Sequence, residues 1–119
     1  MAYVIDLVKD AKYVSLVFTG KVTRNDLETA RDEVSIALTS NSMNRVLVDI
    51  SQSIIEMSFL DHFQFTSEHQ AYFPRGGRIA LVISQDEMKG YQFIEDVSQN
   101  RGVNVKLFSE KSQACNWLL

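Results

Sequence analysis

Both histidines of the chain lie in the segment DHFQFTSEHQ, which covers residues 61–70, and each follows a carboxylate directly. Such pairs of acid and imidazole can perform general acid–base chemistry or bind a metal ion. On an α-helix, however, the separation of seven residues between His62 and His69 places the two rings on one face but about 10.5 Å apart along the axis. Two ligands of one ion on a helix prefer a separation of three or four residues. The spacing therefore predicts no shared metal site, and no cofactor is expected.

The two carboxylates have simpler explanations than catalysis. Ser58 and Asp61 have the spacing of a capping box, so we expect Asp61 in the first turn of a helix. Glu68 falls on the side of that helix opposite Phe59, where it should face water. Elsewhere in the chain, no nucleophile-elbow pattern places serine, histidine and aspartate for catalysis. The sequence therefore shows no catalytic constellation, and we expect that the protein is not an enzyme.

Aromatic side chains form two stripes on the helix expected around this segment. Phe59, Phe63 and Phe73 make one stripe, which we expect to face the sheet. Phe65 and Tyr72 lie about 100° away, with the two histidines between the stripes. Either a neighbouring helix covers Phe65 and Tyr72, or these two rings line a pocket or a subunit interface together with the histidines.

Length and composition limit the kind of protein and its partners. A chain of 119 residues with 45% apolar and 23% charged residues is expected to form one domain over residues 1–119. The net charge of −3 gives no basic face for nucleic acid. No run of about 18 apolar residues occurs, so we do not expect the protein to span a membrane. Cys115 is the only cysteine and has no partner for an internal disulfide, which favours a cytoplasmic location.

Strand and helix patterns alternate along the chain. Two short alternating stretches predict an N-terminal hairpin, and two runs rich in valine and isoleucine predict strands buried on both faces. Start signals at Thr23, Ser58, Ser84 and Ser109 predict four helices. The expected strands cover residues 3–7, 14–18, 45–50, 78–84 and 103–107, the last at a sheet edge, and the expected helices cover 23–38, 58–73, 84–97 and 109–118. This order predicts an α/β fold with a mainly parallel five-stranded sheet, an antiparallel N-terminal strand and four helices.

A second candidate site is the edge of the sheet at which the parallel strands end. Open α/β sheets usually bind ligands there, and Thr19-Gly20, Asp49 and residues 84–86 would gather at this edge. Structural roles account for most of them, because Ser84 would cap a helix and Gly20 would permit a turn. Asp49 is less easily explained and is a candidate ligand-binding residue. The alternative is that its carboxylate accepts hydrogen bonds from N–H groups of the following loop.

The second half of the chain resembles a known family. The resemblance rests on Phe65 and His69 in the expected helix, and on four later features in the same order: Arg78-Ile79-Ala80 opening a strand, Phe108 closing the last strand, Ala114, and Trp117-Leu118. On these residues the chain resembles the SpoIIAA-like family, which is related to the domain of sulfate transporters and anti-sigma-factor antagonists (STAS) and more loosely to the lipid-carrying Sec14 domain. The resemblance implies helices packed on a sheet and no established enzymatic activity. His69 matches the family pattern, whereas His62 does not.

The antagonist branch of this larger family carries a phosphorylated serine in an Asp-Ser-Ser-Gly-like turn before the second helix. Here FLDHF stands in that place, with His62 or its neighbour where the serine would be and without the glycine. The resemblance therefore implies that this phosphorylation switch is absent. The loop at residues 51–58 is longer than expected, so Ser58 remains an alternative position for the serine.

These observations lead to two hypotheses. The first is a non-catalytic STAS-like module for protein–protein interaction or regulation, whose partner is another protein or a second copy in a homodimer, bound through the second helix and the loop before it. The alternative, implied by the similarity to Sec14, is a pocket for a small apolar ligand or a lipid beneath that helix. The candidate binding residues for either role are Phe65, His69, Tyr72, His62 and Asp49.

Overall fold

The fold is built on one mixed sheet. The computed structural model describes residues 2–119, and the strands lie in the order β1-β2-β3-β4-β5, so that each strand pairs with its neighbour in the sequence. β1 is antiparallel to β2, and the other pairs are parallel. The strands are β1 (Tyr3–Val8), β2 (Tyr13–Thr23), β3 (Arg45–Glu56), β4 (Arg78–Val82) and β5 (Asn104–Phe108). The predicted α/β fold, with five strands, four helices and an antiparallel N-terminal strand, is confirmed.

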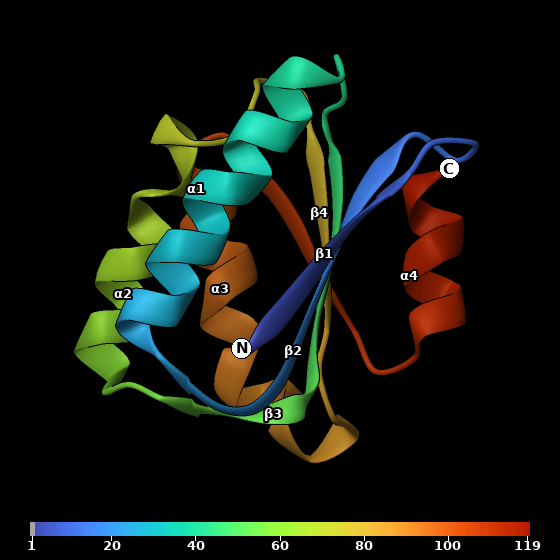
Figure 1. The fold of residues 1–119 in the computed structure, drawn as a ribbon. Helices are drawn as coiled ribbons and strands as arrows, with labels where there is room; N and C mark the ends of the chain where they lie inside the picture. Colours follow the sequence, from blue (N-terminus) through green and yellow to red (C-terminus); the bar gives the residue numbers. More distant parts are fainter. Residues whose placement is uncertain (1) are drawn as a thin grey trace.

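The strand order decides which face each helix covers. Each crossover from β2 to β5 advances by one place in the same direction, and right-handed crossovers of this kind put their helices on one face. These helices are α1 (Arg24–Ser40), α2 (Phe59–Ser67) and α3 (Met88–Asn100). The last helix, α4 (Lys111–Leu118), follows β5 and covers the opposite face (Figure 1). The sheet is therefore the middle layer of three.

Two hydrophobic cores result, one on each face of the sheet. The larger core lies between the sheet and α1, α2 and α3, and the smaller core lies between the sheet and α4. Val46 of β3 belongs to the first core and the next residue, Leu47, to the second. Because both faces of the central strands are covered, their sequences are almost continuously apolar.

β2 and β3 are longer than the sequence indicated. Both strands continue past their buried halves, and residues 19–23 of β2 pair with residues 52–56 of β3 after a one-residue register shift. Thr19 and Gly20 therefore lie inside β2 and not at the carboxyl edge of the sheet, where they were expected. The polar residues Gln52 and Ser53 suggested a loop, but their backbone is paired in the sheet and their side chains are accessible to water.

The helix boundaries match the predictions only in part. Thr23 and Asp26 form the full capping box of α1. α2 ends at Ser67, and a short 3₁₀ helix, η1 (His69–Ala71), replaces its expected continuation to Phe73. α3 is preceded by a second 3₁₀ helix, η2 (Gln85–Glu87), and Ser84 makes no side-chain cap. The last helix begins at Lys111, two residues after the predicted start.

Gly77 is the position in this fold where a side chain has no room. A Cβ atom at Gly77 would lie 2.5 Å from the backbone oxygen of Asn44, the same oxygen that accepts a hydrogen bond from Arg78 at the start of β4. We predict that Gly77→Ala lowers the free energy of unfolding by about 1–3 kcal/mol. The matched control is Gly90→Ala in the exposed part of α3, where nothing lies within 4 Å and alanine should stabilise by about 0.5–1 kcal/mol. Urea denaturation of both variants tests this difference, and equal effects would contradict it.

Candidate functional site

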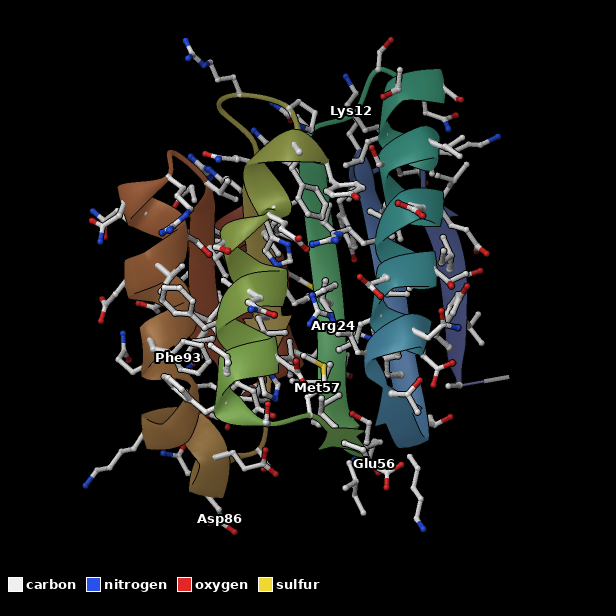
Figure 2. All side chains as sticks on the ribbon, turned by 90° about the vertical axis from the view of Figure 1, so that its left-hand side faces the viewer. Lys12, Arg24, Glu56, Met57, Asp86 and Phe93 are labelled. Atoms are coloured by element: carbon white, nitrogen blue, oxygen red, sulfur yellow. The ribbon has the colours of Figure 1, made fainter. Side chains whose placement is uncertain are left out.

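An apolar cavity of about 100 Å³ lies between the sheet and the three helices of the first layer. Its floor consists of apolar side chains from β2 to β5, and α1, α2, η1 and α3 form the other walls. The polar side chains in the lining are Arg31 of α1, His62 and Thr66 of α2, His69 of η1 and Tyr91 of α3. Figure 2 looks onto these helices from the solvent side. The cavity therefore brings both histidines together with a charged residue that lies far away in the sequence.

Arg31 is the centre of the polar contacts beside the cavity. Its side chain is 4% exposed, and its guanidinium contacts three groups at the end of α2. Nη1 donates a hydrogen bond of 2.8 Å to the carbonyl oxygen of Phe65 and lies 3.5 Å from Nδ1 of His69. Nη2 donates to a carboxylate oxygen of Glu68 at 3.3 Å. A cation at these last carbonyl groups of α2 is favourable for the helix dipole and satisfies a terminal backbone oxygen.

Two aromatic rings enclose the same guanidinium. Its central carbon lies 4.3 Å from the ring centroid of Phe65 and 4.0 Å from that of Tyr72. Distances below 6 Å permit cation–π attraction, which is strongest where water is excluded. The first alternative was that a neighbouring helix covers Phe65 and Tyr72. The helix α1 does so, because its residue Arg31 packs on both rings. The second alternative was that the two rings line a pocket, and Phe65 does line the cavity.

His69 is held as a neutral ring. Burial and the charge of Arg31 lower the pKa of His69 from 6.5 to about 3. Since Nδ1 faces an Nη1 group of Arg31 that only donates, Nδ1 is the acceptor and the proton is on Nε2. The ring stands edge-on to Phe65 and Phe73, with centroids 5.0 Å and 5.4 Å away. His69 is therefore a poor general base for water-exposed chemistry but a firmly positioned part of the cavity wall.

His62 lines the same cavity from the preceding turns of α2. Burial lowers its pKa, and the nearby carboxylate of Asp61 acts in the opposite direction. Its ring makes edge contacts with Tyr91 and Phe93 of α3, at centroid distances of 5.4 Å and 6.3 Å. Both histidines reach the cavity, but His69 does so from η1 and not from the continuous helix on which the two rings were expected to share a face.

The two acids next to the histidines take part in links between helices. The backbone N–H of Asp61 donates to the Ser58 hydroxyl at 3.2 Å, as a capping serine requires. The Asp61 carboxylate, however, binds Arg24 of α1 at 3.0 Å, and Arg24 lies between α1 and α2 in Figure 2. Both side chains of this pair are substantially exposed, so it contributes little to stability. Glu68 is half exposed and binds Arg31, so it is more than the solvated acid that was expected.

Asp49 lies apart from the histidines. Residues two positions apart in a strand point to the same face of the sheet, so Asp49 shares the face of Leu47 in β3. Leu47 packs on the face that α4 covers. The Asp49 carboxylate accepts hydrogen bonds from the backbone N–H and the hydroxyl of Ser51, at 2.9 Å and 2.6 Å. Its role as an acceptor for the following backbone is therefore observed, and the sheet separates it from the cavity.

One expected aromatic stripe is oriented differently from the prediction. Phe59 and Phe63 were expected to face the sheet, but they are 66% and 37% exposed. The inward face of α2 instead carries Thr66 and the cavity-lining residues, and only Phe73 of the expected stripe reaches the cavity. Phe59 packs on Phe93 of α3 with 4.8 Å between ring centroids. The helical wheel failed because α2 lies beside α3 as well as over the sheet, so that hydrophobicity alone does not say which stripe is inward.

Sequence reasoning missed Arg31, although a signal was present. Arg31 sits within the buried stripe of α1 that includes Ala30, Val34 and Leu38. A charge at such a position needs buried partners, because an unpaired buried charge is costly. Those partners are Phe65, Glu68, His69 and Tyr72, far away in the sequence, and nothing in the linear pattern identified them.

Among residues 2–119, no group of three or more histidine, cysteine, aspartate or glutamate side chains is placed to hold a metal ion. None of the helices described in this range is both long and apolar enough to cross a lipid bilayer. The candidate site consists of the cavity and of Arg31 in its lining.

The three-layer arrangement and the strand order define the class as an α/β protein with a STAS-like fold. The chain belongs to the SpoIIAA-like family, whose model matches residues 13–119. No curated protein matches the chain.

Solved structures support the same fold. An uncharacterized protein with a SpoIIAA-like fold from Shewanella loihica PV-4 is similar with a TM-score of 0.64 and 21% identity, over 99% of this chain and 93% of that chain. The anti-sigma factor antagonist SpoIIAA in its unphosphorylated form gives 0.61 and 16%, over 98% and 97%. The Bacillus cell fate determinant SpoIIAA in its phosphorylated form gives 0.58 and 15%, over 99% and 100%. At these identities the likeness shows the fold alone.

The lowered pKa of His69 predicts a specific loss of stability in acid. An unfolded chain takes up a proton at His69 as the pH falls below about 6.5, whereas the folded chain resists until the pH approaches about 3. The stabilisation is complete above pH 6.5 and decreases as the pH falls, by about 2 kcal/mol at pH 5. His69→Gln should therefore lose less stability between pH 7 and pH 5 than the unchanged protein does.

The measurement is urea denaturation at both pH values. His62→Gln is the matched control, because His62 shares the cavity but lacks the direct contact with Arg31. Equal pH dependence in the His69→Gln variant and the unchanged protein would show that His69 does not carry this effect.

Proposed function

We propose that this protein is a non-catalytic interaction module that binds another protein through the exposed apolar side chains of Phe59, Leu60 and Phe63, here named the α2 patch. The observation that carries the proposal is their exposure: 66% for Phe59, 63% for Leu60 and 37% for Phe63. Positions 59, 60 and 63 are neighbours on the helix surface, so these side chains form one continuous area. Large apolar groups grouped in this way mark interaction surfaces, and aromatic residues supply much of the binding energy there.

The place of the α2 patch in the fold supports this proposal. It lies on the first turns of α2, directly after the loop from β3, which is the part of the chain expected to bind a partner. Phe59 packs on Phe93 of α3, and Figure 2 labels Phe93 on this face of the molecule. A second helix therefore supports part of the patch. One similar structure is described as an anti-sigma factor antagonist, a role that consists of contacts between proteins. We propose the cytoplasm as the place of this interaction, because the single cysteine needs no oxidising compartment.

We also propose that binding does not depend on a phosphorylated serine. Ser58 is the only serine at the start of α2, and its hydroxyl already accepts the N–H of Asp61 as the helix cap. The carboxylates of Glu56 and Asp61 lie within three residues of it in the sequence, and a phosphate added beside them would meet like charge. In this proposal the α2 patch is available at all times, and partner concentration controls the interaction.

Shortening two rings of the α2 patch should remove partner binding without unfolding the protein. The change is Phe59→Ala together with Phe63→Ala, and the matched control is Val4→Ala together with Ile36→Ala, two other exposed apolar residues on β1 and α1. Loss of two contact rings should weaken partner binding at least tenfold. Quantitative affinity purification from the native host, followed by binding measurements with each captured protein, compares the three forms, and sedimentation tests a second copy as the partner. Equal binding by all forms would contradict the proposal.

A second candidate function follows from the cavity. An apolar space beneath α2 is the usual form of a small-molecule site. Phe65, His69 and His62 line this space, and Tyr72 packs on the guanidinium of Arg31 beside it. We propose that these residues form the site for a small apolar ligand. A volume of about 100 Å³ accommodates a body of a few carbon atoms, since about 150 Å³ is enough for benzene in an engineered cavity.

A matched pair of valine substitutions tests whether the cavity is open space. Val48 lines the cavity, whereas Val14 is fully buried in the same core and is absent from the lining. Val48→Leu adds one carbon into the space and should change the free energy of unfolding by less than about 1 kcal/mol. Val14→Leu should destabilise by about 1–3 kcal/mol through overpacking. Chemical denaturation measures the free energy of unfolding of both variants. Equal destabilisation by the two substitutions would show that the space beside Val48 is already filled by side chains.

A further inference from the structure

Arg31 has one buried donor that no group among residues 2–119 uses. Its side chain is 4% exposed, yet Nε is buried without a hydrogen-bond partner among the described residues. Leaving a charged donor unpaired in an apolar interior is unfavourable, because the donor loses its hydrogen bonds to water and gains none in the protein. Arg31 also lines the cavity. An acceptor supplied by a bound molecule would therefore satisfy a group that the fold itself leaves open.

The shape of the guanidinium indicates what that acceptor is. Nη1 is occupied by the Phe65 carbonyl and by Nδ1 of His69. On the other edge, Nε–H and one N–H of Nη2 point in parallel and form a fork. Only Nη2 is engaged there, through a single bond of 3.3 Å to Glu68. A carboxylate matches this fork because its two oxygens accept both N–H groups at once.

We propose that the cavity binds a small monocarboxylate, with its charged group on the Nε–Nη2 edge of Arg31 and its apolar body against the sheet. This inference rests on the second candidate function and names its ligand class. The apolar lining and the volume of about 100 Å³ suit a hydrocarbon body of about three or four carbon atoms, smaller than benzene. A phosphate would bring up to two negative charges to one cation, with Glu68 already beside it, so the single charge of a carboxylate fits better.

Glu68 is the internal competitor of this ligand. Its side chain is 50% exposed, so it can leave Nη2 for water at small cost. While it stays, its charge repels an incoming carboxylate. His69 adds no charge of its own, because its pKa of about 3 keeps the ring neutral at pH 7. The remaining side chains of the lining are apolar except for Thr66, His62 and Tyr91. Burial lowers the pKa of His62 and raises the pKa of Tyr91, so both side chains are neutral at pH 7.

The experiment compares three unbranched ligands that have five carbon atoms each and differ in the terminal group. Pentanoate, pentan-1-ol and pentylamine are titrated into the full chain at pH 7, and methyl chemical shifts in NMR spectra report both affinity and location. We expect pentanoate to bind at least tenfold more tightly than either other compound and to shift the methyl groups of Val48 and Leu81, which line the cavity. Equal binding of pentanoate and pentan-1-ol would overturn the carboxylate inference but leave the apolar pocket standing. Binding of none of the three would overturn both.

Two substitutions test whether Arg31 attracts the carboxylate of pentanoate and whether Glu68 competes with it. Arg31→Gln should weaken pentanoate binding at least tenfold and leave pentan-1-ol unaffected. Glu68→Gln should tighten pentanoate binding several-fold, because it removes the competing charge from an exposed side chain. The matched control is Glu110→Gln, which makes the same change of charge at the start of α4, on the other face of the sheet. If Arg31→Gln does not fold, Glu68→Gln decides, and unchanged or weaker pentanoate binding by that variant would overturn the inference.

Discussion

The guanidinium of Arg31 is the constraint on which the first layer of helices depends. α2 is short, and its end, η1 and the rings of Phe65 and Tyr72 all meet this one cation. Burying a charge is costly, so the position is tolerable only because a carbonyl, a carboxylate and two aromatic faces surround it. These contacts join the end of α2 and η1 to α1, and Arg31 also lines the cavity between these helices and the sheet.

The fold could be predicted because its determinants are local. The runs RVLVDI and RIALVIS identify strands covered on both faces, and the handedness of crossovers then places the helices between them. The extension of β3 to Glu56 could not be predicted in the same way. Its polar residues lie where the sheet is open to water, and there the side chains carry little information about whether the backbone is paired.

The sequence predicted only those features of the site that depend on the spacing of residues within one helix. Helical spacing placed His62 and His69 on a common face, and both do reach the cavity. The same reasoning wrongly predicted that Phe59 and Phe63 face the sheet. A helical wheel describes one helix without its neighbours, and it does not include the apolar contact that α3 makes with Phe59. The link from Arg31 to Glu68 joins residues 37 positions apart. Such a pairing is a property of the assembled layers and has no signature in a single sequence.

The sequential order of the strands has a consequence for how this chain acquires its structure. Every strand pairs only with strands that precede or follow it directly, so each parallel pairing closes a loop of little more than one helix and its connections. Loop-closure entropy grows with the length of the loop, and low contact order accelerates folding. A parallel sheet is usually slow to form because its partners are distant in the chain. Here the sheet can grow one unit at a time, so its topology favours rapid folding and leaves few long-lived unpaired edges open to aggregation.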